Sequence, residues 1–123
     1  MTTVEFDYAR AGSLDEALSM LAEGGMDAKL LAGGHSLLPA MKLRLSMPGK
    51  LIDISELDEL SGIEEQGERL RVGALTTHRT VEHSDLARQH CPALAELAAQ
   101  IGDPQVRNRG TIGGSLAHAD PAA

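Results

Sequence analysis

Two adjacent glycines, Gly33 and Gly34, follow an apolar stretch and precede His35 and Ser36. Glycine has no Cβ, so the backbone N–H groups of such a turn can approach a ligand closely. A helix that begins after the turn would add a partial positive charge at its N-terminus. Together these features suit a bound phosphate, to which the hydroxyl of Ser36 can donate a hydrogen bond. The same residues are also compatible with a tight turn capped by serine, and no partner for His35 as a catalytic base is visible.

A second glycine pair lies in residues 111–115, Thr-Ile-Gly-Gly-Ser, again beside hydroxyl side chains. Alone, this stretch is compatible with a β-bulge or a hairpin. Two hydroxyl-flanked glycine loops in one chain indicate an extended ligand held from two sides. A flavin dinucleotide has the right shape, with a central pyrophosphate and a flat apolar ring. His35 and His118, with Asp120, could instead be metal ligands, although the histidines lack the spacing of a helical metal site.

Composition excludes several other functions. Neither a GxxxxGK[ST] P-loop nor a GxGxxG dinucleotide signature occurs. The formal net charge of −7 argues against general nucleic-acid binding and fits a soluble cytoplasmic protein. Cys91 is the only cysteine, which excludes an internal disulfide and a cysteine-based zinc or iron–sulfur site. No apolar run is long enough to span a membrane, and the N-terminus does not resemble a signal peptide.

A helix is predicted over residues 13–23, and it is the first of the elements that must position the first glycine loop. Ser13 and Glu16 form a capping box at its start. Its apolar residues at positions i, i+3, i+4 and i+7 are expected to form one buried face: Leu14, Ala17, Leu18 and Leu21. Gly24-Gly25 is expected to end the helix.

A small α/β unit is predicted around this helix. Residues 28–32 are short, apolar and bounded by glycines, as in a buried strand. Ser36 can cap a short helix after the glycine pair, with Pro39 in its first turn. Residues 51–54, Leu-Ile-Asp-Ile, read as another strand. The order helix, strand, glycine turn, helix, strand predicts parallel pairing.

The pattern changes after Glu56. A hairpin is expected to turn at residues 66–67. Its inward-facing residues would be Leu70, Val72 and Ala74. Thr77 can cap a short helix that runs through His83, and a later apolar helix is closed by Gly102.

The chain closely resembles the FAD-binding medium subunit of molybdenum hydroxylases. The segments that carry the resemblance, in order, are AGGHSLLPAMKLRL, LIDI, VGALTTHRTVEHS and IGDPQVRNRGTIGGSLAHADPAA. The family includes aerobic carbon-monoxide dehydrogenase and the flavin subunits of xanthine dehydrogenase-like enzymes. The resemblance implies an α+β FAD-binding fold of the vanillyl-alcohol oxidase type. A small α/β lobe would occupy residues 1–56, and the start of a mainly antiparallel β lobe would occupy residues 57–123.

The resemblance also implies FAD as the cofactor and electron transfer as the role. Electrons would come from a molybdenum-cofactor large subunit through the iron–sulfur clusters of a small subunit, and FAD would pass them to a quinone, NAD or oxygen. The positions matched to the first FAD loop, around the pyrophosphate, are Ala32, Gly33, Gly34, His35, Ser36 and Leu37. Those matched to the second loop are Thr111, Gly113, Gly114 and Ser115. Ile101 would pack near the flavin ring, and Asp120 lies in the Asp-Pro segment. No catalytic side chain is implied, because the redox chemistry is the flavin's.

The chain departs from this family in length, since the medium subunits are more than twice as long. It stops just after Pro121, within the second lobe, so it is expected to be a fragment or a short form completed by a partner. Strands expected at residues 68–75 and 111–117 would then have open edges, which favour self-association or pairing with another chain. A truncated assembly module that keeps the fold without functional FAD is the alternative function.

Overall fold

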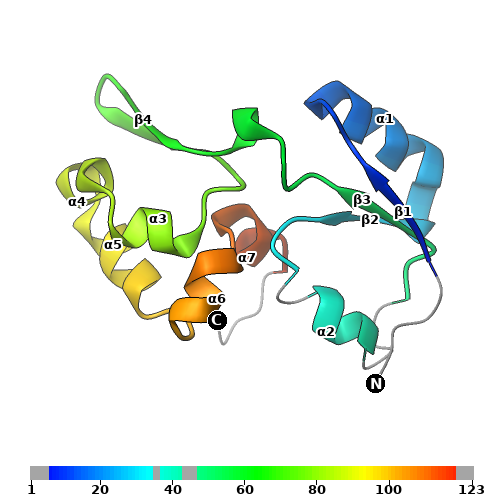
Figure 1. Ribbon diagram of the computed structural model, residues 1–123. Coiled ribbons are helices and arrows are strands. Elements are labelled where there is room, and N and C mark those ends of the chain that lie inside the picture. The colour runs from blue at the N-terminus through cyan, green and yellow to red at the C-terminus, as the bar shows by residue number, and fades with distance from the viewer. Residues whose placement is uncertain (1–5, 35–36, 43–46, 119–123) are drawn as a thin grey trace. The chain divides into compact units, whose positions relative to one another are not determined.

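The computed structural model describes residues 6–34, 37–42 and 47–118 (Figure 1). The chain divides into two compact units, Met1–Leu57 and Asp58–Ala123. Each unit has a sheet and buried residues of its own.

The first unit is built on a three-stranded parallel sheet. Its elements, in chain order, are β1 (Asp7–Arg10), α1 (Leu14–Gly24), the 3-10 turn η1 (Gly25–Asp27), β2 (Ala28–Leu31), α2 (Leu37–Lys42) and β3 (Lys50–Asp53). Strand β3 lies between β1 and β2 and pairs in parallel with both, as Figure 1 shows. The predicted parallel α/β pattern is confirmed, and β1 adds a strand that the sequence patterns did not indicate.

Helix α1 begins and ends within one residue of the predicted bounds. The Oγ of Ser13 accepts a hydrogen bond from the amide of Glu16 at 3.1 Å, and Gly25 ends the helix with a φ of 58°. The predicted apolar face is only partly covered. Ala17 is buried, but Leu18 is 56% exposed, so its prediction as a core residue is wrong. The helix contacts β2 and β3, and a sheet of three short strands is too narrow to cover the whole face.

The core of the first unit is centred on β3. Leu51 and Ile52 are 1% and 0% exposed, and Met41 from α2 is fully buried as well. The prediction of a buried strand at residues 28–32 is wrong in part, because Leu30 is 42% exposed. Strand β2 is at the edge of the sheet and has a neighbour on one side only. A run of apolar residues therefore indicated the strand correctly but overstated its burial.

The described residues of the second unit form a mainly helical structure. Its elements, in chain order, are the 3-10 turn η2 (Asp58–Leu60), β4 (Ile63–Gln66), β5 (Arg69–Val72), α3 (His78–Glu82), α4 (Asp85–His90), α5 (Pro92–Ala99), α6 (Pro104–Arg109) and α7 (Ile112–His118). Strands β4 and β5 form the predicted antiparallel hairpin, in which Gln66 pairs with Arg69. The core residues are Val81, Ala87, Ala95 and Ala98, with Ile63, Leu70, Val72 and Leu94 packed against them. Ala74, predicted to face inward, is exposed.

The expected start of a mainly antiparallel β lobe is confirmed only as the β4–β5 hairpin, which is followed by five helices within the described residues. The prediction of a further strand is wrong. The strand expected at residues 111–117 is helix α7. The Oγ1 of Thr111 accepts a hydrogen bond from the amide of Gly114 at 3.0 Å, and such a cap favours a helix start. This contact and packing outweigh the low helix propensity of two glycines. Across the described part of the chain, no helix is long and apolar enough to cross a membrane.

Candidate functional site

The first glycine pair follows the carboxyl end of β2 and precedes α2. Gly34 has a φ of 81°, in the left-handed region that glycine adopts at little cost. Its carbonyl accepts a hydrogen bond from the amide of Leu38 at 3.1 Å. A Cβ at Gly34 would lie 2.9 Å from Cδ1 of Leu38. The turn therefore requires glycine for its backbone conformation, and a larger residue would also have to displace the end of the Leu38 side chain.

The other residues predicted for the first loop flank this turn. Ala32, Gly33 and Leu37 are each partly buried. His35 and Ser36 lie outside the described residues, so their predicted contacts with a ligand stay predictions.

A buried carboxylate lies at the same edge of the sheet as this turn. Asp53, at the end of β3, is in register with Leu31, the last residue of β2. It accepts hydrogen bonds from the Oγ of Ser55 at 2.6 Å and from the hydroxyl of Tyr8, and Arg10 Nε lies 3.9 Å from Oδ2. Burial would raise the pKa of Asp53, but the hydrogen bonds from Ser55 and Tyr8 outweigh burial and lower that pKa below its usual value. Asp53 is thus an ionised group that ties β1 to β3.

We expect Asp53→Asn to destabilise the first unit by about 1–3 kcal/mol at neutral pH, because charge-assisted hydrogen bonds are lost. The folded pKa lies below the unfolded value of about 3.9, so the ionised group contributes stability that is fully present above the unfolded pKa. That stability is lost as pH falls through the folded pKa. Denaturant unfolding over a pH series should show that the difference in free energy of unfolding between parent and variant shrinks below about pH 3.9. A difference that widens in acid would contradict this assignment.

The second glycine loop is packed against residues 74–77 of its own unit. Thr111 is 7% exposed and forms an isolated antiparallel bridge with Thr77. The amide of Gly113 donates to the carbonyl of Ala74 at 2.8 Å, and the amide of Gly114 donates to Thr111. A Cβ on Gly113 would lie 2.7 Å from that carbonyl oxygen. These glycines therefore permit a close approach within the chain, and their two amides already have acceptors there.

Ser115 is an exposed residue whose hydroxyl contacts a buried histidine. Its Oγ lies 2.9 Å from Nε2 of His78, the first residue of α3. His78 is 4% exposed, and burial lowers the pKa of its imidazole. Sequence patterns did not single out His78, because one histidine in a short helix carries no spacing signal. The contact joins residues that are distant in sequence.

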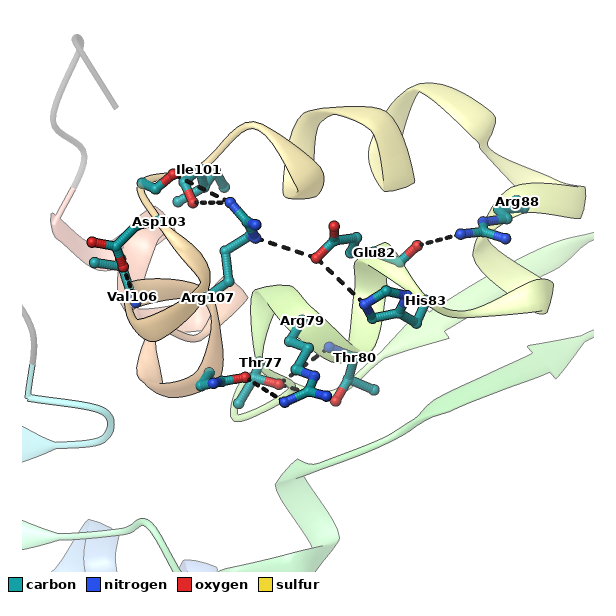
Figure 2. Close-up of polar contacts among 12 residues, drawn as sticks. Thr77, Arg79, Thr80, Glu82, His83, Arg88, Ile101, Asp103, Val106 and Arg107 are labelled. Carbon is teal, nitrogen blue, oxygen red and sulfur yellow. Dashed lines mark hydrogen bonds and ion pairs between the residues drawn. The ribbon is translucent and has the colours of Figure 1, made fainter.

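Ile101, predicted to pack near a flavin ring, lies between α5 and α6 and is partly buried. Arg107 of α6 donates from Nη1 to the carbonyl oxygens of Ile101 at 3.3 Å and Gly102 at 3.2 Å. Its buried Nε lies 3.2 Å from Oε2 of Glu82 on α3, an ion pair without an aligned hydrogen bond among the described residues. Figure 2 shows Arg107 between the Ile101 turn and Glu82. Arg107 therefore fixes the main chain at Ile101 relative to α3.

Arg107→Ala should lower the free energy of unfolding by about 1–3 kcal/mol, because Glu82 loses its guanidinium partner in a mostly buried setting. Arg71→Ala is the matched control. Arg71 pairs with Glu64 at 3.8 Å, but the two side chains are 60% and 66% exposed, so the expected loss is about 0.5 kcal/mol or less. Denaturant unfolding of the two variants measures the difference, and equal losses would contradict the role given to Arg107.

Two further sequence predictions concern the end of the chain. Asp120 lies outside the described residues, and its predicted cofactor contact stays a prediction. His118 is the last residue of α7 and is exposed. No group of three or more His, Cys, Asp or Glu side chains suited to a metal occurs among the residues that the structure describes. His35 and Asp120, the other candidate ligands, are not among them.

Comparisons with known proteins agree on one family. Residues 4–123 match the family described as "FAD binding domain in molybdopterin dehydrogenase". The chain is 50% identical over 121 residues to the carbon monoxide dehydrogenase medium chain of Hydrogenophaga pseudoflava, covering 98% of this chain and 42% of that protein. It is 37% identical to the xanthine dehydrogenase FAD-binding subunit of Escherichia coli O157:H7, covering 96% of this chain and 41% of that protein.

Solved structures show the same similarity in three dimensions. The structure of Hydrogenophaga pseudoflava carbon monoxide dehydrogenase that lacks the Mo-pyranopterin moiety of its cofactor matches with a TM-score of 0.96 and 51% identity, covering 98% of this chain and 42% of that chain. Quinoline 2-oxidoreductase from Pseudomonas putida 86 matches with a TM-score of 0.95 and 40% identity, covering 100% of this chain and 43% of that one. The chain thus spans about two fifths of the length of these relatives. It belongs to the family of FAD-binding domains in molybdopterin dehydrogenases.

Proposed function

We propose that this chain is the FAD-binding part of the medium subunit of a molybdenum-containing hydroxylase or dehydrogenase. The observation that carries the proposal is the family match over residues 4–123. The names of the relatives support it, since they include a medium chain and a FAD-binding subunit of dehydrogenases. FAD, when bound, supplies the redox chemistry, and the chain's own residues bind the cofactor and orient it.

The first loop fits the pyrophosphate of FAD. Ligands of parallel α/β sheets bind beyond the carboxyl ends of the strands, where the turn at Gly34 lies. Because Gly34 has no side chain, a ligand can approach the main chain closely there, and peptide N–H groups of this turn can donate to phosphate oxygens. Ala32, Gly33 and Leu37 hold the turn between β2 and α2. His35 and Ser36 enter the proposal from the sequence alone, with Ser36 as a hydroxyl donor.

The second loop contributes mainly through a side chain. We assign Ser115, an exposed residue, as the donor to the cofactor. Thr111, Gly113 and Gly114 hold the start of α7, because their polar contacts lie within the chain. Ile101 packs against the flavin ring in this proposal, and Asp120 makes a polar contact with the cofactor.

The complete protein would act within a larger complex. An iron–sulfur small subunit would deliver electrons from a molybdenum-cofactor large subunit, and a quinone, NAD or oxygen would accept them. The vanillyl-alcohol oxidase type of the complete fold and a cytoplasmic location belong to the same proposal. Self-association through open strand edges remains part of it for residues 68–75, which include β5 of the two-stranded hairpin. Residues 112–118 no longer support it, because they form a helix. Sedimentation velocity tests the association directly.

The alternative is an assembly module that keeps the fold without functional FAD. One observation favours it, namely that the amides of Gly113 and Gly114 are bonded within the chain. Flavin absorbance of the purified protein separates the two functions. A yellow protein, or a colourless one that gains stoichiometric flavin after incubation with FAD, supports cofactor binding. A colourless protein that takes up no added FAD favours the assembly module.

A further inference from the structure

His78 contacts the segment that carries Ser115 through both its main chain and its side chain. The amide of His78 donates to the carbonyl of Gly110 at 3.0 Å, and its ring reaches Ser115 at 2.9 Å. A Cβ on Gly110 would lie 3.0 Å from Cδ2 of that ring, so the loop closes tightly on the imidazole. Main chain and side chain of the histidine are therefore both attached to the segment that carries Ser115.

The direction of the hydrogen bond between His78 and Ser115 determines whether the serine hydroxyl can donate to an anion. A serine hydroxyl has one proton, and a neutral imidazole has one nitrogen that donates and one that accepts. If Nε2 accepted the serine proton, Ser115 would present only lone pairs, which repel a phosphate oxygen. If Nε2–H donates to Oγ, the serine proton is free to point outward. Only the second arrangement makes Ser115 a donor to a phosphate.

We propose that His78 is a positioning residue for cofactor binding: its Nε2–H donates to the Oγ of Ser115, so that the serine hydroxyl donates to a phosphate oxygen of FAD. This inference rests on the proposed function and adds a residue that sequence patterns did not reveal. It also accounts for a buried histidine whose Nε2 contacts the hydroxyl of an exposed serine. The lowered pKa keeps the ring neutral near pH 7, where the choice between the two tautomers matters.

We call the two successive hydrogen bonds, from His78 to Ser115 and from Ser115 to a phosphate oxygen, the relay. A double-mutant cycle on FAD affinity tests it. Ser115→Ala should weaken FAD binding by roughly ten- to a hundredfold, as expected for one hydrogen bond to a charged group. His78→Ala should weaken it by about three- to tenfold, and should have no further effect in the Ser115→Ala background. His78→Gln should stay within about threefold of the parent, because the glutamine amide can donate from nearly the same place. Affinities are compared per folded molecule, with unfolding curves measured beside them.

Two controls separate positioning from a general structural role. His83→Ala changes a histidine of the same unit that is exposed, and FAD affinity should not change. Riboflavin has no phosphate, so its affinity should not respond to His78→Ala, whereas the affinity for ADP should. Nitrogen-15 chemical shifts of the His78 ring in the unliganded chain should show a proton on Nε2 and none on Nδ1.

The outcomes distinguish the inference from the function on which it rests. If the parent binds FAD but His78→Ala acts equally with and without Ser115, the relay is overturned and the proposed function stands. A proton on Nδ1 of the neutral ring overturns the relay in the same way. If the parent binds neither FAD nor ADP, the proposed function fails and the relay fails with it.

Discussion

Gly34→Val will lower the affinity for FAD by roughly ten- to ten-thousand-fold, the loss expected from one or two charge-assisted hydrogen bonds at about 1.5–3 kcal/mol each. A valine cannot readily adopt the φ of 81° found at this position. Its Cβ would also lie 2.9 Å from Leu38 of α2. The turn must then rearrange, and its N–H groups leave the positions that would meet the phosphates. Fluorescence titration of FAD measures the change.

Gly25→Val is the matched control for backbone strain. Gly25 belongs to the same unit and has a φ of 58°, but a Cβ there would meet nothing within 4 Å. It ends α1 and lies outside the proposed binding loop. This variant should lose stability and keep its FAD affinity. If Gly34→Val binds FAD as the parent does, the first glycine pair is only a turn.

Ile52→Ala will lower the free energy of unfolding by about 2–5 kcal/mol, the range for deleting a large aliphatic side chain from a core. Ile52 is 0% exposed and lies in β3, the central strand of the parallel sheet. The loss combines transfer of apolar surface with the cavity left between β3 and its neighbours. Denaturant unfolding measures this loss. Because β2 pairs with β3, the glycine turn that follows β2 should be destabilised as well.

Leu18→Ala is the control for Ile52→Ala, because it removes a large aliphatic side chain that is mostly exposed. The helical spacing of Leu18 predicts a core residue, yet it is 56% exposed, so the expected cost is about 1 kcal/mol or less. Similar losses for Leu18→Ala and Ile52→Ala would contradict the burial described for the first unit.

Local signals predicted much of the fold. The hydroxyls of Ser13 and Thr77 accept the backbone hydrogen bonds expected of helix caps. Gly25 ends its helix with a positive φ, and the hairpin turns within one residue of the predicted place. Each of these features depends on residues within a few positions of one another, which is the range over which sequence patterns carry physical information.

The errors arise where distant residues decide the outcome. The strand expected at residues 111–117 is helix α7, and the close approach of Gly113 to Ala74 at its start is a tertiary contact that local sequence patterns do not reveal. The exposure of Leu18 depends on the width of the sheet. The same holds for the candidate site, because the links from His78 to Ser115 and from Arg107 to Glu82 are set by tertiary packing. The resemblance supplied the loops but not these supporting side chains.

Calorimetric titration of the chain with FAD, FMN and ADP tests the central claim most directly. FAD contains both the flavin ring and the pyrophosphate, FMN lacks the pyrophosphate, and ADP lacks the ring. A chain whose glycine loops hold a flavin dinucleotide should bind FAD more tightly than either, with ADP retaining the part of the affinity that depends on Gly34 and Ser115. Equal affinity for FMN and FAD, or no binding of FAD at all, would contradict the claim.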